Sequence, residues 1–231
     1  MDLKGFAVDI DGTITEDGGI INLDAAYTLR WLNKMDYKVI FVSGRSAWEV
    51  LALSVYIGTT KVVVGENGGV VATSPVDLFL LADISYGIMG YDYLCKRIKN
   101  VKKKKGFPRL TEVVLERNFN LNEGRKILNE SGLPVTIQDS KYGYHVSHET
   151  VSKANGLKIA AKNLGLDTSQ IIAIGDSEID IPMFEVCGYS VALGNAPETV
   201  KKKADFSVNF NMGEGFLEAI QHITEKFMKI H

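Results

Sequence analysis

The sequence has few cysteines, almost no net charge and no long apolar run. Only Cys95 and Cys187 occur among 231 residues. Their spacing suits no metal site, so we expect two buried free thiols in a reducing compartment. The formal net charge is −2, which provides no basic field to attract nucleic acid or acidic membranes. This balance predicts a small-molecule partner.

The start of the chain and its apolar stretches argue against membrane targeting. The N-terminal residues contain no basic segment followed by a long apolar run, so no signal peptide is expected. The longest apolar stretches, such as Val76 to Ala82, are too short to span a bilayer. We therefore expect a cytoplasmic protein that binds neither nucleic acid nor membrane.

Short apolar runs rich in β-branched residues alternate with helical patterns at both ends of the chain. The runs predicted to be buried strands are 6–8, 38–42, 61–64, 171–174 and 190–193. The last segment places Phe216, Ile220, Ile223 and Phe227 at three- and four-residue intervals, which predicts an amphipathic closing helix. This alternation predicts an α/β fold with a doubly wound, mainly parallel sheet and helices on both faces.

The middle of the chain, residues 83–151, has a different pattern. Helical stretches and alternating strands are mixed here, at 91–99, 112–115, 123–129, 135–137 and 144–146. The lysine run at 102–105, followed by Gly106, predicts an exposed turn. We interpret residues 83–151 as a small α+β domain inserted into a core domain of residues 1–82 and 152–231.

The first predicted strand ends in an acidic motif. Side chains two apart on a strand point the same way, so Asp9 and Asp11 converge where the strand ends. Gly12 permits a sharp turn there. Ligands of open α/β sheets bind outside the carboxyl ends of the strands, and a hard cation such as Mg²⁺ relieves repulsion between adjacent carboxylates. The alternative is an ordinary Asp-Gly turn in which Asp11 caps a helix.

A second acidic cluster follows another predicted strand. Asp176 and Asp180 come after the apolar run at 171–175, and Pro182 fits the first turn of the next helix. Because parallel strands end at the same edge of a sheet, these carboxylates are placed to complete a metal site with Asp9. Alternatively, Asp180 only caps that helix.

Two further elements suggest phosphate chemistry. Ser43 and Gly44 follow the strand at 38–42, where a hydroxyl and backbone N–H groups can hold phosphate oxygens. Lys153 precedes a helical run, and a cation there opposes the helix dipole. Neutralising a phosphate and several aspartates would explain its position. The alternatives are a common Ser-Gly turn and a solvated surface lysine.

The order of these motifs, DxDGT, SGR, a lysine and GDxxxD, resembles the haloacid dehalogenase superfamily of phosphohydrolases. The later stretch VALGNAPETVKKKADF is similar to the Cof-type members, and the insertion between SGR and the lysine resembles their C2 cap. The short chain and compact cap are most similar to archaeal-type phosphoglycolate phosphatases. The sequence departs from the usual pattern at Ile179, where relatives carry asparagine, which leaves open whether Asp180 binds metal directly or through water.

The resemblance implies a Rossmann-like core and a phosphatase that forms an aspartyl-phosphate. Asp9 would be the nucleophile and Asp11 the general acid and base. The implied Mg²⁺ ligands are Asp9, Asp11 (through its main-chain carbonyl in the superfamily), Asp176 and Asp180. The implied phosphate-binding residues are Ser43, Gly44 and Lys153.

The substrate implied by the resemblance is a small phosphorylated metabolite, most closely 2-phosphoglycolate. A sugar-phosphate phosphatase and a phosphomutase-type phosphotransferase stay open, and a homodimer is possible. Residues 66–69 follow a strand and either line the site or form a plain glycine turn. His145 and His148 sit three apart in a predicted strand, so a metal site there is not favoured.

Overall fold

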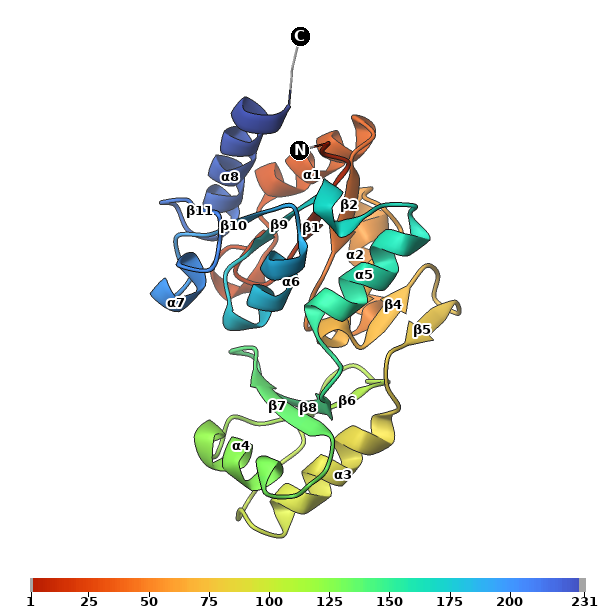
Figure 1. The fold of residues 1–231 in the computed structure, drawn as a ribbon, viewed down its shortest axis with the longest axis vertical. Coiled ribbons are helices and arrows are strands. Elements are labelled where there is room, and N and C mark those ends of the chain that lie inside the picture. Colours follow the sequence, from red (N-terminus) through yellow and green to blue (C-terminus); the bar gives the residue numbers. More distant parts are fainter. Residues whose placement is uncertain (1, 229–231) are drawn as a thin grey trace.

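The computed structural model describes residues 2–228, and a five-stranded parallel sheet lies at its centre (Figure 1). The strand order is β11-β10-β9-β1-β2. These strands are β1 (Gly5–Val8), β2 (Lys38–Phe41), β9 (Ile171–Gly175), β10 (Tyr189–Ala192) and β11 (Phe206–Ser207). All four pairings are parallel. The predicted α/β class with a mainly parallel sheet is confirmed.

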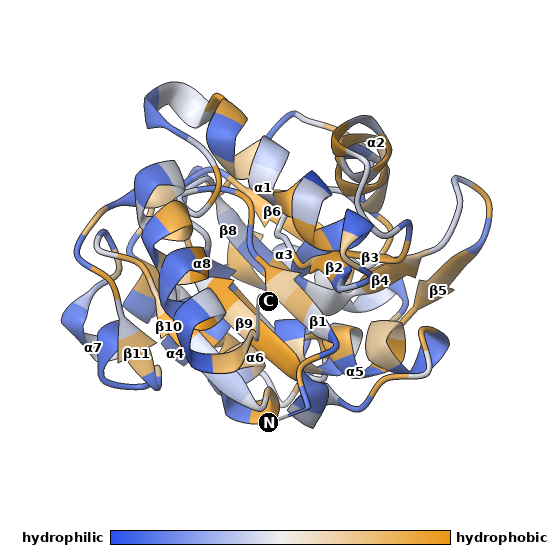
Figure 2. Ribbon diagram, turned by 90° about the horizontal axis from the view of Figure 1, so that it is seen from above, coloured by the Kyte–Doolittle hydropathy of each residue, from blue (hydrophilic) through white to orange (hydrophobic). Residues whose placement is uncertain are grey.

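Helices cover both faces of this sheet (Figure 2). One face packs against α1 (Leu23–Lys34), α2 (Ala47–Ile57) and α8 (Met212–Phe227). The other packs against α5 (Lys153–Asn163), α6 (Ile181–Val186) and α7 (Glu198–Lys201). Successive strand side chains alternate between the two cores, as Phe6 and Val8 lie in the first and Ala7 in the second. Burial on both faces explains why these strands are apolar throughout.

Strand β3 (Val63–Gly65) belongs to a separate antiparallel sheet with β4 (Val70–Ala72) and β5 (Leu78–Leu80). A single parallel bridge between Val42 and Val64 joins it to the end of β2. Strands β4 and β5 are not among the strands that the sequence pattern predicts. Strand β4 has only three residues after a glycine pair, and β5 is a partly exposed edge strand without the alternation that marks a half-buried strand.

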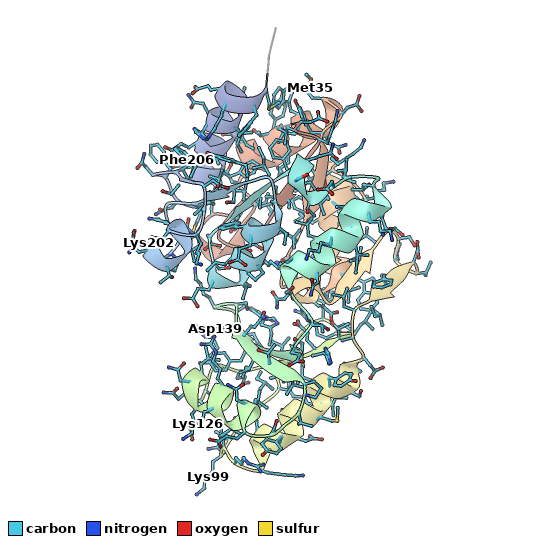
Figure 3. The ribbon with its side chains drawn as sticks, in the orientation of Figure 1. Met35, Lys99, Lys126, Asp139, Lys202 and Phe206 are labelled. Carbon is cyan, nitrogen blue, oxygen red and sulfur yellow. The ribbon has the colours of Figure 1, made fainter. Side chains whose placement is uncertain are left out.

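The segment that follows β5 and precedes α5 forms a second unit with its own sheet and core, which we call the cap unit. Its strands β6 (Glu112–Leu115), β8 (Tyr144–His148) and β7 (Val135–Asp139) are antiparallel in that order. Helices α3 (Ile84–Cys95) and α4 (Leu121–Asn129) pack on the sheet face that points away from the parallel sheet (Figure 1). Figure 3 shows Asp139 at the end of the cap unit nearest the parallel sheet, and Lys99 and Lys126 at the far end.

Helix α3 begins seven residues earlier than the predicted helix at 91–99, and it ends at Cys95. Asp83 caps its first turn by accepting a hydrogen bond from the Ser85 N–H at 2.8 Å. The buried face of α3 includes Gly87 and Gly90, where no apolar side chain marks the helical period. A Cβ at Gly87 would lie 2.7 Å from the Val146 carbonyl oxygen, so glycine permits this close approach of helix and strand.

Two smaller expectations need correction. Cys95 is exposed on α3 and Cys187 is half-buried, so the prediction of two buried thiols is wrong for Cys95, although both are free. Burial raises the pKa of the Cys187 thiol to about 12. The lysine run at 102–105 is largely exposed, but it lies beside β6, since the Lys104 N–H donates to the Val114 carbonyl. No helix among residues 2–228 is long and apolar enough to cross a membrane.

Candidate active site

Three buried carboxylates and one buried ammonium converge at the carboxyl edge of the parallel sheet. Asp9, Asp176 and Asp180 each place one carboxylate oxygen within 4.8 Å of the others. The Lys153 Nζ lies 2.7 Å from Asp9 Oδ1 and 2.6 Å from Asp180 Oδ1. Strand register creates this convergence, because Val8 on β1 lies opposite Ile174 on β9 and their next residues lead into the two acidic motifs.

Burial sets the electrostatics of this cluster. Burial raises the pKa of Asp9 to about 8, the Lys153 charge opposes the rise, and the carboxylates of Asp180 and Asp176 add to it. Burial and the Asp180 charge also raise the pKa of Asp176. Burial disfavours the charged form of Lys153, but the Asp180 and Asp9 carboxylates outweigh this and raise its pKa. The cluster therefore has more carboxylates than its one buried cation can neutralise.

Lys153 is the first residue of α5 and is fully buried, at 1% exposure. Ser152 caps the helix by accepting a hydrogen bond from the Asn155 N–H at 3.2 Å. The alternative of a solvated surface lysine is therefore wrong. A buried ammonium at a helix N-terminus is unfavourable by itself, and the contacts with two carboxylates compensate for it.

Asp180 has partners on both of its oxygens. Its Oδ2 accepts hydrogen bonds from the N–H groups of Asp176 and Ser177 at 3.0 and 2.9 Å, and from the Ser177 hydroxyl. Its Oδ1 faces Lys153. The side chain thus fixes the loop after β9 and holds the buried lysine. It makes no capping hydrogen bond to α6, so the alternative that Asp180 only caps that helix is wrong.

Asp11 lies at the same edge, but its carboxylate is not one of the three that cluster. Its side chain is 49% exposed and forms a two-pronged ion pair with Arg45, at 2.8 Å to Nε and 2.6 Å to Nη2. The turn between Asp9 and Asp11 leads into Gly12, whose φ of +82° suits glycine. A Cβ there would lie 2.7 Å from Asp176 Oδ2, so Gly12 lets the two acidic loops meet.

Ser43 and Gly44 lie where β2 ends, close to Asp11. Ser43 is buried, and its hydroxyl accepts a hydrogen bond from the Arg45 N–H at 3.2 Å. The Gly44 carbonyl accepts one from the Arg109 Nη1 at 2.6 Å. The structure therefore brings the predicted phosphate-binding turn to the same edge as the acidic cluster.

Three other polar residues lie at this edge and are not among the site residues predicted from the sequence. Arg45 pairs with Asp11, as described. The Asn195 Nδ2 donates to the Gly12 carbonyl and to Asp176 Oδ2, both at 2.9 Å. The Lys141 Nζ, from the cap unit, lies 3.0 Å from Asp176 Oδ2. The position of Asn195 just after β10 is a strand-end signal that could have identified it, whereas nothing local in the sequence marks Lys141.

A cavity of about 680 Å³ opens beside the cluster, between the parallel-sheet unit and the cap unit. Asp9, Asp11, Ser43 and Asp176 line it from the parallel-sheet side. Lys141 is among the cap-unit residues that line it. Ile179, at the position where the motif departs from the usual pattern, also lines the cavity. The cavity is large enough for a small metabolite.

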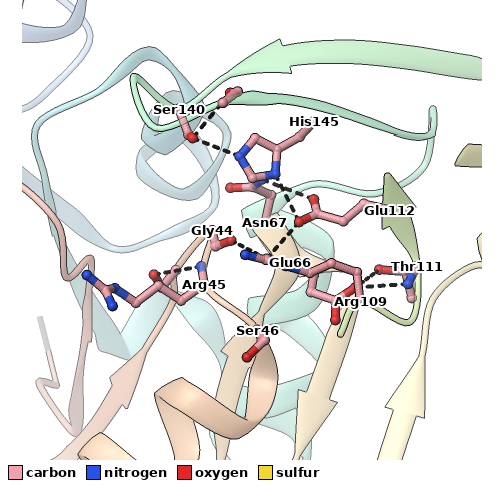
Figure 4. Close-up of polar contacts among 12 residues, drawn as sticks. Gly44, Arg45, Ser46, Glu66, Asn67, Arg109, Thr111, Glu112, Ser140 and His145 are labelled. Carbon is pink, nitrogen blue, oxygen red and sulfur yellow. Dashed lines mark hydrogen bonds and ion pairs between the residues drawn. The ribbon is translucent and has the colours of Figure 1, made fainter. Parts of the chain in front are cut away.

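A buried hydrogen-bond network joins the two units next to this cavity, and we call it the core–cap network (Figure 4). Glu66 accepts hydrogen bonds from the N–H groups of Leu110 and Thr111 and from the Thr111 hydroxyl, at 2.8 to 3.0 Å. Asn67 donates to Glu112 at 3.4 Å. The segment at 66–69 is therefore buried and connects the units, and neither Glu66 nor Asn67 is among the residues lining the cavity.

His145 also belongs to the core–cap network. Its Nδ1 lies 2.9 Å from Glu112 Oε1 and its Nε2 lies 2.7 Å from the Ser140 hydroxyl. His148 contacts Thr150 instead. The two histidines thus have different hydrogen-bond partners.

The buried Glu66 carboxyl should make the free energy of unfolding depend on pH. Burial, and then the Glu112 charge, raise the pKa of Glu66 from 4.5 to about 7. The folded state then holds a proton that the unfolded state releases, so the free energy of unfolding falls as pH rises from about 4.5 to 7. Such a shift is worth roughly 3 kcal/mol. In urea unfolding between pH 5 and pH 8, Glu66→Gln should show a flatter profile than the wild type.

The exposed residue Glu185 on α6 provides the matched control, because Glu185→Gln removes the same charge outside the network. Its pH profile should parallel that of the wild type. Parallel profiles for Glu66→Gln and the wild type would contradict the assignment of this pH dependence to Glu66.

A parallel sheet with an acidic cluster at its carboxyl edge is a combination that can be compared with known protein families. A family model of haloacid dehalogenase-like hydrolases matches residues 6–81 and 95–220, and the chain belongs to this family. The predicted class of enzyme, a phosphatase of the haloacid dehalogenase superfamily, is confirmed.

The curated relatives carry a more specific name. The chain is 46% identical over 224 residues to the phosphoglycolate phosphatase of Nitrosopumilus maritimus, a match that covers 96% of this chain and 97% of that protein. It is 36% identical to the phosphoglycolate phosphatase of Archaeoglobus fulgidus, with 95% and 96% covered. The predicted likeness to archaeal phosphoglycolate phosphatases is confirmed.

Solved structures share the fold. The Thermoplasma acidophilum 0175 structure matches with a TM-score of 0.84 at 22% identity and covers 96% of this chain and 98% of that one. A haloacid dehalogenase-like hydrolase from Bacteroides thetaiotaomicron matches with a TM-score of 0.78 at 20% identity, with 96% and 99% covered. At these identities, the likeness concerns the fold alone.

Proposed function

We propose that this chain is a magnesium-dependent phosphomonoester hydrolase that forms a phosphoaspartate on Asp9, and that its substrate is 2-phosphoglycolate. One observation carries the reaction type: a buried carboxylate, Asp9, pairs with Lys153 in an acidic cluster that opens onto a cavity. The substrate is supported by relatives named phosphoglycolate phosphatase that align over nearly the whole chain.

In the first half of the reaction, a carboxylate oxygen of Asp9 attacks phosphorus in line with the leaving oxygen. The bond from Asp9 to phosphorus forms while the ester P–O bond breaks. Lys153 holds Asp9 Oδ1 at 2.7 Å, which orients the nucleophile and supplies positive charge beside the transferring phosphoryl group. Ser43 and the N–H groups of the turn at Gly44 bind phosphoryl oxygens.

In the second half, water hydrolyses the phosphoaspartate. The water oxygen bonds to phosphorus while the bond from phosphorus to Asp9 breaks, which restores the carboxylate and releases inorganic phosphate. Asp11 gives a proton to the departing alkoxide in the first half and takes one from the attacking water in the second. Its carboxylate is half-exposed at the cavity, so it can exchange protons there. Arg45 holds both of its oxygens, so Asp11 must be released from one of these hydrogen bonds to carry the transferred proton.

The donor set suits a hard divalent cation. Three buried carboxylates share one buried ammonium, and Mg²⁺ prefers one or two carboxylates together with water and phosphate oxygens. Asp9, Asp176 and the Asp11 main-chain carbonyl would hold the ion, and Asp180 would act through water because both its oxygens already have partners. When bound, the ion supplies positive charge to the phosphoryl group.

We further propose that residues 83–151 are an inserted cap domain on a core of residues 1–82 and 152–231. The separate sheet and apolar core of the cap unit support this division. Closing over the cavity, the cap would exclude water and select the substrate. The cytoplasmic location and the homodimer stay predictions.

Release of free phosphate tests the proposed function. Among phosphate monoesters ranked by kcat/KM, 2-phosphoglycolate is expected to rank first, ahead of sugar phosphates. Activity should vanish in EDTA and return with Mg²⁺. Mg²⁺ should also raise the thermal unfolding midpoint, since a ligand at about 100 times its Kd adds about 2.7 kcal/mol to the free energy of unfolding.

Asp176→Asn is the control for the metal, because it removes a charged ligand and should abolish the midpoint shift by Mg²⁺. An isomerised product without free phosphate would favour a phosphomutase-type transferase. A sugar phosphate in first place would favour the sugar-phosphate phosphatase. No phosphate release from any monoester, with Mg²⁺ present, would refute the proposed function.

A further inference from the structure

The cap unit contributes only cations to the charged lining of the cavity. Its lining residues are Gly106, Phe107, Arg109, Ser140, Lys141 and Tyr142. Among the described residues that line the cavity, every carboxylate comes from the parallel-sheet unit. A substrate whose phosphate lies at Asp9 therefore meets positive charge where it faces the cap unit.

Arg109 has the most buried side chain of the three described cationic residues that line the cavity. Its side chain is only 12% exposed, and its Nη1 donates to the Gly44 carbonyl at 2.6 Å and to Glu112 Oε1 at 2.8 Å (Figure 4). Both hydrogen bonds come from Nη1, although a guanidinium has five N–H donors on three nitrogens. Within residues 2–228, Nε and Nη2 of Arg109 make no hydrogen bond. Glu112 is completely buried and does not line the cavity, whereas Arg109 does.

The backbone that carries Arg109 is fixed to the parallel-sheet unit. Directly after it, the N–H groups of Leu110 and Thr111 donate to the buried Glu66 carboxylate at 2.9 to 3.0 Å. The guanidinium is tied to the same unit through Gly44. Such preorganisation lowers the entropy lost when a ligand binds.

The other two cations around the cavity are less suited to bind substrate. The Lys141 side chain is 61% exposed, and its ammonium contacts Asp176 in the acidic cluster. Arg45 uses Nε and Nη2 on Asp11 and is 40% exposed. Arg109 is more buried than either and is not paired with an acidic residue of the cluster.

We propose that Arg109 selects the substrate by binding a second anionic group, a carboxylate, at the end of the molecule opposite the transferring phosphate. The planar guanidinium matches a carboxylate in geometry. Arg109 would thus confer a preference for short phosphomonoesters that carry a carboxylate, and it would leave the phosphoryl-transfer step itself unchanged. This proposal rests on the proposed function.

The test compares two esters that differ only at the end away from the phosphate, 2-phosphoglycolate and 2-hydroxyethyl phosphate. For the wild type, kcat/KM should favour 2-phosphoglycolate. In Arg109→Met the ratio of the two kcat/KM values should fall about 10- to 100-fold, the effect expected for a charge-assisted hydrogen bond. Both esters are assayed on one preparation, so the folded fraction cancels in the ratio. Arg109→Lys should keep part of the preference because it keeps the charge.

Arg97→Met is the matched control, since Arg97 lies two residues after the end of α3, outside the cavity, against the Tyr93 ring. In Arg97→Met, the ratio of kcat/KM for 2-phosphoglycolate to kcat/KM for 2-hydroxyethyl phosphate should equal that of the wild type. If Arg109→Met lowers kcat/KM by the same factor for both esters, the role of Arg109 is purely structural and the proposal is overturned. A wild type that hydrolyses both esters equally well would also overturn it and leave the phosphatase proposal intact, whereas failure of the proposed function would appear as no turnover of either ester.

Discussion

Asp9→Asn should lower kcat by on the order of 10⁵-fold, because a carboxamide cannot replace the carboxylate nucleophile. The protein should stay folded. Burial raises the pKa of Asp9 to about 8, and the neighbouring carboxylates contribute, so removing this charge relieves repulsion in the folded state. We therefore expect a free energy of unfolding equal to or above that of the wild type. Steady-state phosphate release and urea unfolding measure the two quantities.

The matched control for Asp9→Asn is Asp92→Asn, which removes the same charge from an exposed position on α3. It should leave kcat unchanged. Trapping experiments add an independent readout, since labelled phosphate should attach to acid-quenched wild type and not to Asp9→Asn. Turnover close to the wild-type value in purified Asp9→Asn would remove Asp9 from the nucleophile position.

Lys153→Met should reduce both rate and stability. The lysine is buried, and its ammonium contacts Asp9 and Asp180 at 2.7 and 2.6 Å. Methionine keeps most of the volume but leaves these carboxylates buried without a cation. Breaking a buried ion pair in this way costs about 3–5 kcal/mol, and losing the cation beside the phosphoryl group should lower kcat about 10²- to 10³-fold.

Lys158→Met is the control for Lys153→Met, because Lys158 lies on the same helix, α5, and is exposed. Urea unfolding in EDTA isolates the protein's own charges. There, adding Asp180→Asn to Lys153→Met should recover part of the lost stability, since it removes one unpaired carboxylate. A rate change below about twofold in Lys153→Met would exclude a role for the lysine in transfer.

The fold and part of the site could be predicted from local sequence patterns. Apolar runs at 6–8 and 171–174 mark strands that are buried on both faces, and the residue after such a strand lies at the carboxyl edge of the sheet. For this reason Asp9, Ser43 and Asp176 could be placed at one edge without coordinates. The strand β5 could not be predicted in this way, because it is short and partly exposed.

The pairing of side chains could be predicted much less well. The Asp11 side chain shares the strand-end motif with Asp9, yet it turns to Arg45, 34 residues later. The spacing of residues along one strand does not predict that Asp11 pairs with Arg45. The same holds for Lys141, which reaches Asp176 from the cap unit.

The sequence by itself determined the class of fold, the edge where the acidic motifs end and the kind of chemistry that they suit, because strand periodicity and turn residues act over a few positions. Only the tertiary structure decided which charges meet. Lys153 contacts Asp9 across 144 positions of the chain, and Arg109 reaches the Gly44 carbonyl across 65. Such contacts depend on how the helices and the cap unit pack on the sheet, and packing is a property of the whole chain and not of any local segment.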